Sequence, residues 1–141
     1  MYTRHKILYK KGYKYQLVDG FTALVDIYPP KVLITEFIIL SPYGELFLKK
    51  GYAWDGATGA IDTRNFMRGS AVHDALYQLM RQGLLDADKY REIADKELRK
   101  ICKEDGMSSF RAAYVYRAVR TFGGRLAKPS AKRRAFTAPK Q

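Results

Sequence analysis

The sequence lacks what disulfide-rich, zinc-cysteine and membrane-spanning proteins need. It has a single cysteine, Cys102, so neither an intramolecular disulfide nor a zinc-cysteine site is expected, and we predict a small core residue in a helical stripe. No run of about 18 apolar residues occurs. Charged residues interrupt the N-terminus before a signal-peptide core begins. The sequence therefore predicts a protein without a transmembrane segment that is made in the cytoplasm.

Acidic residues are scarce, and the shortage is uneven along the chain. There are 26 Lys and Arg against 14 Asp and Glu, which gives a net charge of +12. Residues 125–141 contain basic residues, prolines and no acidic residue, so we expect a basic flexible tail after a domain spanning residues 1–124. Such a tail is attracted to nucleic acid, to anionic lipid or to an acidic protein. A solubilising terminus without a dedicated partner is the alternative.

What is present predicts one α+β domain. The 141 residues are 47% hydrophobic and 13% aromatic, enough for a core. Residues 14–54 alternate like strands, and Pro42 and Gly44 suit a turn between two of them. We expect a small antiparallel sheet of four strands here.

Residues 63–123 change to a helical period and predict three helices. The first is expected to start at Asp62 or Thr63 and to end at Gly83. The second extends from Asp86 to Gly106, and the third starts near Ser108 or Ser109 and stops at Gly123. The expected apolar stripes are Val72, Leu76, Leu79 and Met80; Ala87, Tyr90, Ala94, Leu98, Ile101 and Cys102; and Phe110, Tyr114, Ala118 and Phe122.

Polar residues interrupt the margins of the first two stripes. His73 and Tyr77 are four residues apart and share a helical face, whereas Asp74 is rotated by about 100°. On the second helix, Asp95 follows Ala94 at the edge of the stripe. If these helices form a tight antiparallel pair, Asp95 lies opposite His73 and Tyr77.

That arrangement would suit acid-base chemistry. A carboxylate bonded to one imidazole nitrogen fixes the tautomer and raises the basicity of the other nitrogen. We therefore assign His73 as the candidate base and Asp95 as its orienting partner. Asp74, with carbonyl oxygens of the preceding loop, is a candidate site for a hard cation such as calcium. The candidate ligands in this loop are Trp54, Gly56, Thr58 and Gly59.

Each of these features also has a structural explanation. A histidine beside an apolar stripe is often only hydrogen-bonded, and the glycine-containing loop could simply connect a strand to a helix. A buried His-Asp-Tyr network can also specify one helix pairing without catalysis.

The motifs carry two resemblances. The sequence GYAWDGATGAIDT, followed by SAVHDALYQLMRQGLL, REIADKEL and AVRTFGG, resembles the domain of unknown function 1353 family of tailed bacteriophages and prophages over residues 51–124. This resemblance implies a phage protein, made in the host cytoplasm and associated with the virion in one interpretation. The family has no established activity.

The HDxxY helix followed by an alanine-aspartate pair is also similar to the active-site helices of phospholipase A2 enzymes, especially the viral capsid type. This resemblance implies that His73 activates water, Asp95 orients His73 and Tyr77 supports Asp95. It further implies that Asp74 binds calcium, which polarises the ester carbonyl. The loop WDGATGA departs from the glycine-dense calcium loop of those enzymes.

Two hypotheses follow. In the first, the protein is a calcium-dependent lipid ester hydrolase that acts at an anionic phospholipid surface of the host membrane. In the second, it is a non-catalytic virion, tail or assembly component whose residues 125–141 bind DNA or a neighbouring phage protein. A dedicated nucleic-acid-binding role rests on charge alone.

Overall fold

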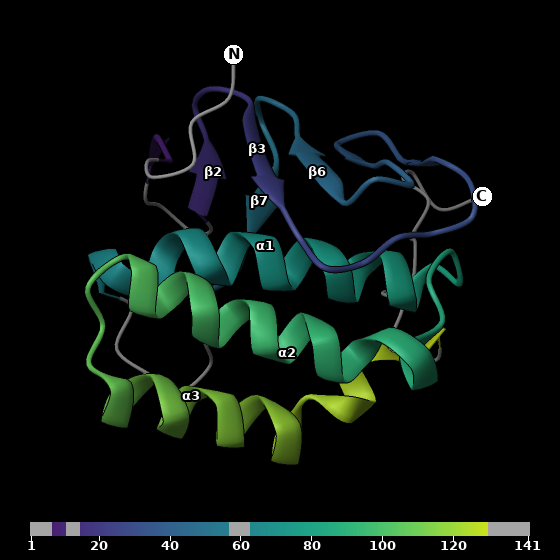
Figure 1. Ribbon diagram of the computed structural model, residues 1–141. Coiled ribbons are helices and arrows are strands. Elements are labelled where there is room, and N and C mark those ends of the chain that lie inside the picture. Colours follow the sequence, from purple (N-terminus) through teal and green to yellow (C-terminus); the bar gives the residue numbers. More distant parts are fainter. Residues whose placement is uncertain (1–6, 11–14, 57–62, 130–141) are drawn as a thin grey trace, which may run out of the picture.

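The structure, a computed structural model, describes residues 7–10, 15–56 and 63–129. Within these residues, seven short strands precede three α-helices and a 3-10 turn, which confirms the predicted α+β fold. The strands lie on one side of α1, and α2 and α3 follow in order on its other side (Figure 1). The bounds are β1 Tyr9–Lys10, β2 Tyr15–Leu17, β3 Phe21–Leu24, β4 Leu33–Ile34, β5 Ile38–Leu40, β6 Glu45–Leu48, β7 Ala53–Trp54, α1 Arg64–Arg81, α2 Ala87–Glu104, α3 Ser109–Phe122 and η1 Gly124–Ala127.

The described strands form two antiparallel sheets rather than the single four-stranded sheet that was predicted. One sheet has the order β1-β2-β7 and the other β3-β6-β5-β4. Two of the expected strands are each split in two. The first contains a turn in which Thr35 and Ile38 bond to each other, with Ile38 N 3.0 Å from Thr35 Oγ1. The second is divided between β6 and β7 near Gly51, whose φ is +93°.

The predicted hairpin at residues 41–44 is confirmed. Strands β5 and β6 pair with Leu40 opposite Leu46. Gly44 N donates to Ser41 O over 3.1 Å, and Pro42 occupies the first central position of this turn. Gly44 has a φ of +82°, and a Cβ there would collide with the carbonyl oxygen of Val25, so only glycine fits.

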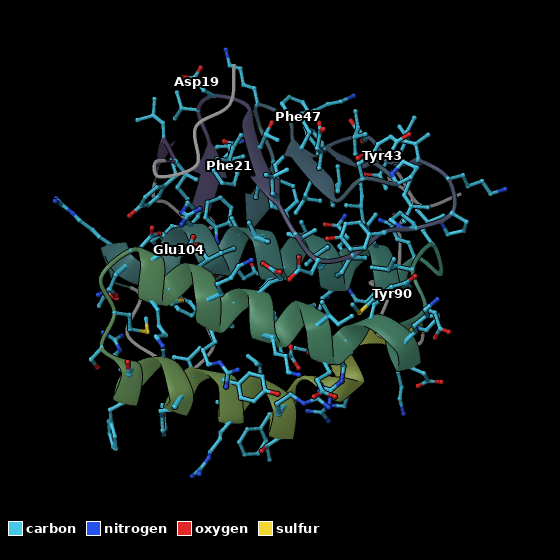
Figure 2. All side chains as sticks on the ribbon, in the orientation of Figure 1. Asp19, Phe21, Tyr43, Phe47, Tyr90 and Glu104 are labelled. Carbon is cyan, nitrogen blue, oxygen red and sulfur yellow. The ribbon has the colours of Figure 1, made fainter. Side chains whose placement is uncertain are left out.

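Helix α1 lies between the sheets and α2, and it is buried on both sides. Its predicted stripe is fully buried, and the stripe of α2 is largely buried with Ala87 at its margin. Leu46 and Leu48 of β6 belong to the same core. Tyr90 and Glu104 mark the two ends of α2, and Phe21 marks the sheet side of the molecule (Figure 2).

Helices α1 and α2 form the expected antiparallel pair. The turn between them contains Gly83 with a φ of +74°, and α2 starts at Asp86, whose side chain accepts a hydrogen bond from Asp88 N over 3.0 Å. A Cβ at Gly69 of α1 would lie only 3.0 Å from the sulfur of Cys102 on α2. Glycine at this position therefore lets the two helices approach closely. Cys102 is buried, as predicted.

Helix α3 packs on α2 through a different face from the one predicted. In the expected stripe, Phe110, Tyr114 and Phe122 are exposed. Instead, α3 packs on α2 through Ala112, which is fully buried, and through two partly buried valines. Small side chains allow α3 to lie close to α2, and this overrides the aromatic stripe in deciding which face is buried.

The chain continues in folded form beyond α3. Residues 125–127, assigned to the tail by composition, belong to η1, where Ala127 is fully buried. Arg81 Nη1 of α1 donates to Leu126 O over 3.1 Å. Residues 130–141 of the predicted tail lie outside the described residues. None of the helices in the described part of the chain is long and apolar enough to cross a membrane.

Candidate active site

The structure brings His73 and Asp95 together at the seam between α1 and α2. His73 Nε2 lies 2.7 Å from Asp95 Oδ1. Asp95 has no exposed surface, whereas the His73 side chain keeps a small exposed fraction. Because the two helices are antiparallel, a position near the middle of α1 meets one near the middle of α2.

Tyr77 joins the same carboxylate. Its hydroxyl donates to Asp95 Oδ1 over 2.7 Å, and its ring lies 4.2 Å from the His73 ring between centroids. The three residues that the helical spacing placed at one seam therefore do meet there. Their hydrogen bonds hold the imidazole in one orientation.

Two arginines complete the surroundings of Asp95, and the sequence interpretation missed both. Arg120 Nη1 of α3 donates to Asp95 Oδ2 over 2.9 Å. Arg91 Nη1 lies 3.7 Å from the same oxygen and donates to the Tyr77 hydroxyl over 3.3 Å. Arg91 precedes Asp95 by four residues on α2, so the sequence contained a signal for it. Arg120 could not be foreseen, because its place depends on how α3 docks.

These contacts keep Asp95 ionised. Burial alone would raise the pKa of Asp95, but the hydrogen bond and charge of His73, with the hydrogen bonds from Tyr77 and Arg120, outweigh it and lower the pKa below its ordinary value. Burial and the nearby Asp95 carboxylate raise the pKa of Tyr77 well above 10.0, so Tyr77 is a neutral donor.

The ionised carboxylate fixes the tautomer of His73. Because Asp95 can only accept, Nε2 of His73 carries the proton that is shared with Oδ1. In the neutral ring, Nδ1 then holds a lone pair and is the nitrogen able to take a proton.

The His73 ring lines a pocket of about 240 Å³ between α1 and α3. Its polar lining comes from α1 and includes His73, Asp74 and Arg81. Its apolar lining includes Leu98 of α2, Phe122 of α3 and Leu126 of η1. A base at the wall of an apolar pocket with a few polar groups is typical of a site for an amphipathic substrate.

Asp74 points to the sheet side of α1, away from the bond between His73 and Asp95. Its Oδ2 accepts a hydrogen bond from the Tyr52 hydroxyl over 2.9 Å. Burial raises the pKa of Asp74 above its ordinary value, although the Tyr52 bond and the charge of Arg81 oppose the shift. Tyr52 stacks on Trp54, with ring centroids 6.0 Å apart. The sequence interpretation missed Tyr52.

The predicted calcium ligands are only partly placed by the structure. Gly56, with a φ of +79°, lines the pocket together with Asp74. Trp54 lies in β7 with its side chain buried against aromatic neighbours. Thr58 and Gly59 lie outside the described residues.

The described residues offer oxygen ligands of the type that calcium binds, but fewer carboxylates than a calcium site usually has. A desolvated carboxylate such as Asp74 would gain from a nearby cation. Calcium takes about six to eight oxygen ligands, however. Across the described residues, no group of three or more His, Cys, Asp or Glu side chains could hold a metal ion.

A larger hollow of about 990 Å³ lies elsewhere, beside the N-terminus of α1. Its buried charge is Arg68, which bonds both oxygens of Asp105 and also Glu104, with the shortest distance 2.8 Å. Because the guanidinium is occupied by these carboxylates, this hollow offers less chemistry than the pocket at His73.

Comparison with known proteins gives no family for the chain, since no family model, no curated protein and no solved structure matches it. The resemblances noted from its motifs therefore stay predictions.

Proposed function

We propose that the protein is a bacteriophage hydrolase of lipid esters, similar to phospholipase A2, in which His73 is the general base. The observation that supports this most strongly is the position of His73. The ring is oriented by the buried, ionised Asp95 and it lines an apolar pocket. Anionic phospholipid of the host membrane is the proposed substrate surface.

In this proposal, His73 Nδ1 removes a proton from a water molecule as the water oxygen bonds to the ester carbonyl carbon. Asp95 stabilises the resulting imidazolium through Nε2 and does not itself take the proton. When the tetrahedral intermediate collapses, the ester C–O bond breaks and the imidazolium returns the proton to the leaving alkoxide. The products are a fatty acid and an alcohol.

Calcium would bind beside Asp74, a carboxylate that lines the pocket and is hydrogen-bonded to Tyr52. When bound, it would polarise the ester carbonyl. Asp74 and the backbone at Gly56 would hold it. The Tyr52 hydroxyl donates a hydrogen bond to Asp74 and so orients its carboxylate.

A non-catalytic virion, tail or assembly role is the second candidate, and two observations favour it. The Asp95 network ties three helices together through Arg91 and Arg120, as a structural network would. In addition, edge strand β4 carries the exposed Ile34 next to the exposed Val32. An uncovered apolar edge of this kind suits a contact with a neighbouring protein, and the basic residues 125–141 would then bind DNA or that neighbour.

The test is fatty-acid release from vesicles of anionic phospholipid, measured with calcium and with a chelator. We expect release by the full chain and its loss, by a factor of about 100 or more, in His73→Ala. The matched control is His5→Ala, which replaces the other histidine of the sequence and should leave the rate unchanged.

Release that His73→Ala does not reduce would contradict the assignment of the base. No release in either condition, with a lower melting temperature in the His73→Ala and Asp95→Asn variants, would favour the structural role. Fatty-acid release in the presence of the chelator would be compatible with His73 as the base but would contradict a role for calcium.

A further inference from the structure

The outer face of α3 carries a continuous row of exposed apolar side chains. The row has a spacing of four residues and continues into η1. Its exposed members are Phe110 at 88%, Tyr114 at 67%, Phe122 at 76% and Leu126 at 53%. Large aromatic side chains exposed together mark an interaction surface more often than a solvated one.

The contact between α3 and α2 does not use this row. Helix α3 packs on α2 through Ala112, with Val115 and Val119 beside it. The helix therefore has two apolar sides, of which the fold uses the side with small residues. The aromatic side does not contact α2, and α3 is the outermost helix (Figure 1).

The charged residues of α3 and η1 are all basic. Arg117 lies on the same exposed side of α3, and Arg125 and Lys128 are exposed at its end. After Asp105 the sequence contains nine lysines and arginines and no acidic residue. A face with aromatic residues and only positive charge is complementary to the interface of an anionic bilayer.

A second copy of the chain fits this face poorly. In a symmetric dimer, each residue of the row would meet the same face of the partner. Arg117 and Arg125 would then lie among other arginines, and α3 and η1 contain no acidic residue to compensate for them. The charge thus favours a lipid surface over self-association.

The row is also continuous with the pocket at His73. Tyr114, Phe122 and Leu126 are exposed and at the same time line that pocket. A bilayer touching this row would lie at the entrance of the pocket, so a lipid chain could enter without crossing water.

We infer that the outer face of α3 and η1 is a docking surface for an anionic lipid bilayer. The aromatic side chains enter the interface and the arginines contact the headgroups. The inference rests on the proposed function for the use of the pocket, whereas the docking itself rests on the exposed side chains and their charge.

The experiment measures binding of the full chain to sedimenting vesicles that contain phosphatidylglycerol or only phosphatidylcholine. The test variant is Phe110→Ala with Arg117→Gln, because neither residue lines the pocket. We expect binding to the anionic vesicles and a loss of about tenfold in the variant. The matched control is Tyr43→Ala, an equally exposed aromatic residue on the sheet side of the molecule (Figure 2).

Three results would overturn the inference. The first is no preference for anionic vesicles, and the second is binding that falls only when Lys132, Arg133 and Arg134 are changed to glutamine. The third is a wild-type chain that sediments as a dimer and a test variant that sediments as a monomer, which would identify a second copy as the occupant.

A soluble short-chain ester separates this inference from the proposed function. The docking variant should hydrolyse the soluble ester at the wild-type rate, and His73→Ala should bind vesicles like the wild type. Loss of soluble hydrolysis in the docking variant would contradict docking as the role of this face. Vesicle binding without any hydrolysis would support the docking surface and contradict the hydrolase.

Discussion

The seam between α1 and α2 and the outer face of α3 both depart from the usual distribution of side chains. The seam buries polar groups, and the outer face of α3 exposes aromatic ones. At the seam, a carboxylate, an imidazole, a phenol and two guanidinium groups meet where apolar residues would ordinarily pack. On α3, aromatic residues stand in water while alanine and valine face the core. Burying polar groups costs desolvation energy, and exposed aromatic residues contribute no burial energy, so folding alone explains neither arrangement and both regions are candidates for function.

The two regions differ in what holds them in place. At the seam, every polar group has a partner, so removing one group leaves others unsatisfied. On the outer face of α3, the aromatic row has solvent as its neighbour, so removing one residue leaves the fold as it was. Mutations should therefore separate the two regions by their effect on stability.

The largest effect is expected from Asp95→Ala. This change leaves the charges of Arg91 and Arg120 without their carboxylate inside the helical layer, and we expect a loss of about 3 kcal/mol or more in the free energy of unfolding. Urea denaturation measures it. Glu92→Ala is the control, because this exposed residue on the same helix forms a surface ion pair with Lys96, and its loss should cost less than about 1 kcal/mol. Equal effects would mean that the network does not stabilise the seam.

A smaller loss is expected from Gly69→Val. The added side chain would overlap with Cys102 and Leu98 of α2, and overpacking of this kind costs about 1–3 kcal/mol. Gly124→Ala is the control, since its new Cβ would find only ordinary contacts with Arg91. A stable Gly69→Val variant would show that close approach of α1 and α2 is not required.

Acid should lower the free energy of unfolding by protonating Asp95 at the seam. Its pKa is lower in the folded chain than the ordinary value of 3.8, so the unfolded chain binds the proton more tightly. The stabilisation from Asp95 is therefore present above about pH 4 and is lost as the pH falls through the folded pKa. Denaturation between pH 2 and 6 should show a steeper acid loss in the wild type than in Asp95→Asn, and identical slopes would contradict the lowered pKa.

The smallest effect on stability is expected on the outer face of α3. Phe110→Ser should change the free energy of unfolding by less than about 0.5 kcal/mol, because the side chain contacts mainly water. Ala112→Leu, two residues away and fully buried, should cost about 1–3 kcal/mol by overpacking. If both changes cost the same, the aromatic row contributes to folding and the contrast between the two faces of α3 is lost.

Local rules were sufficient for the helices and for the meeting of His73, Tyr77 and Asp95. Caps such as Asp86 and stops such as Gly83 depend on a few neighbouring residues, and an antiparallel pair follows from a short turn. The sheets were harder, because the sequence carries no strong signal where the strands are split. The turn at Thr35 joins β4 to β5, which pair with each other, but residues 35–38 contain neither glycine nor proline to mark it.

Helix α3 shows most clearly what the sequence does not specify. Its period reveals an aromatic stripe and also a second side of small residues, and hydrophobicity alone favours burying the stripe. The fold instead buries Ala112, because close contact between two helices requires small side chains. The same choice places Arg120 on Asp95, so one unpredicted rotation of α3 explains both errors.

The solitary cysteine gives the protein an internal reporter. Burial raises the pKa of the Cys102 thiol to about 12, and the sulfur is covered by α1. A thiol reagent attacks the thiolate and needs access to it, so labelling must wait until the helices separate. The labelling rate of the unmodified protein therefore measures how often the helical layer opens, with no engineered probe.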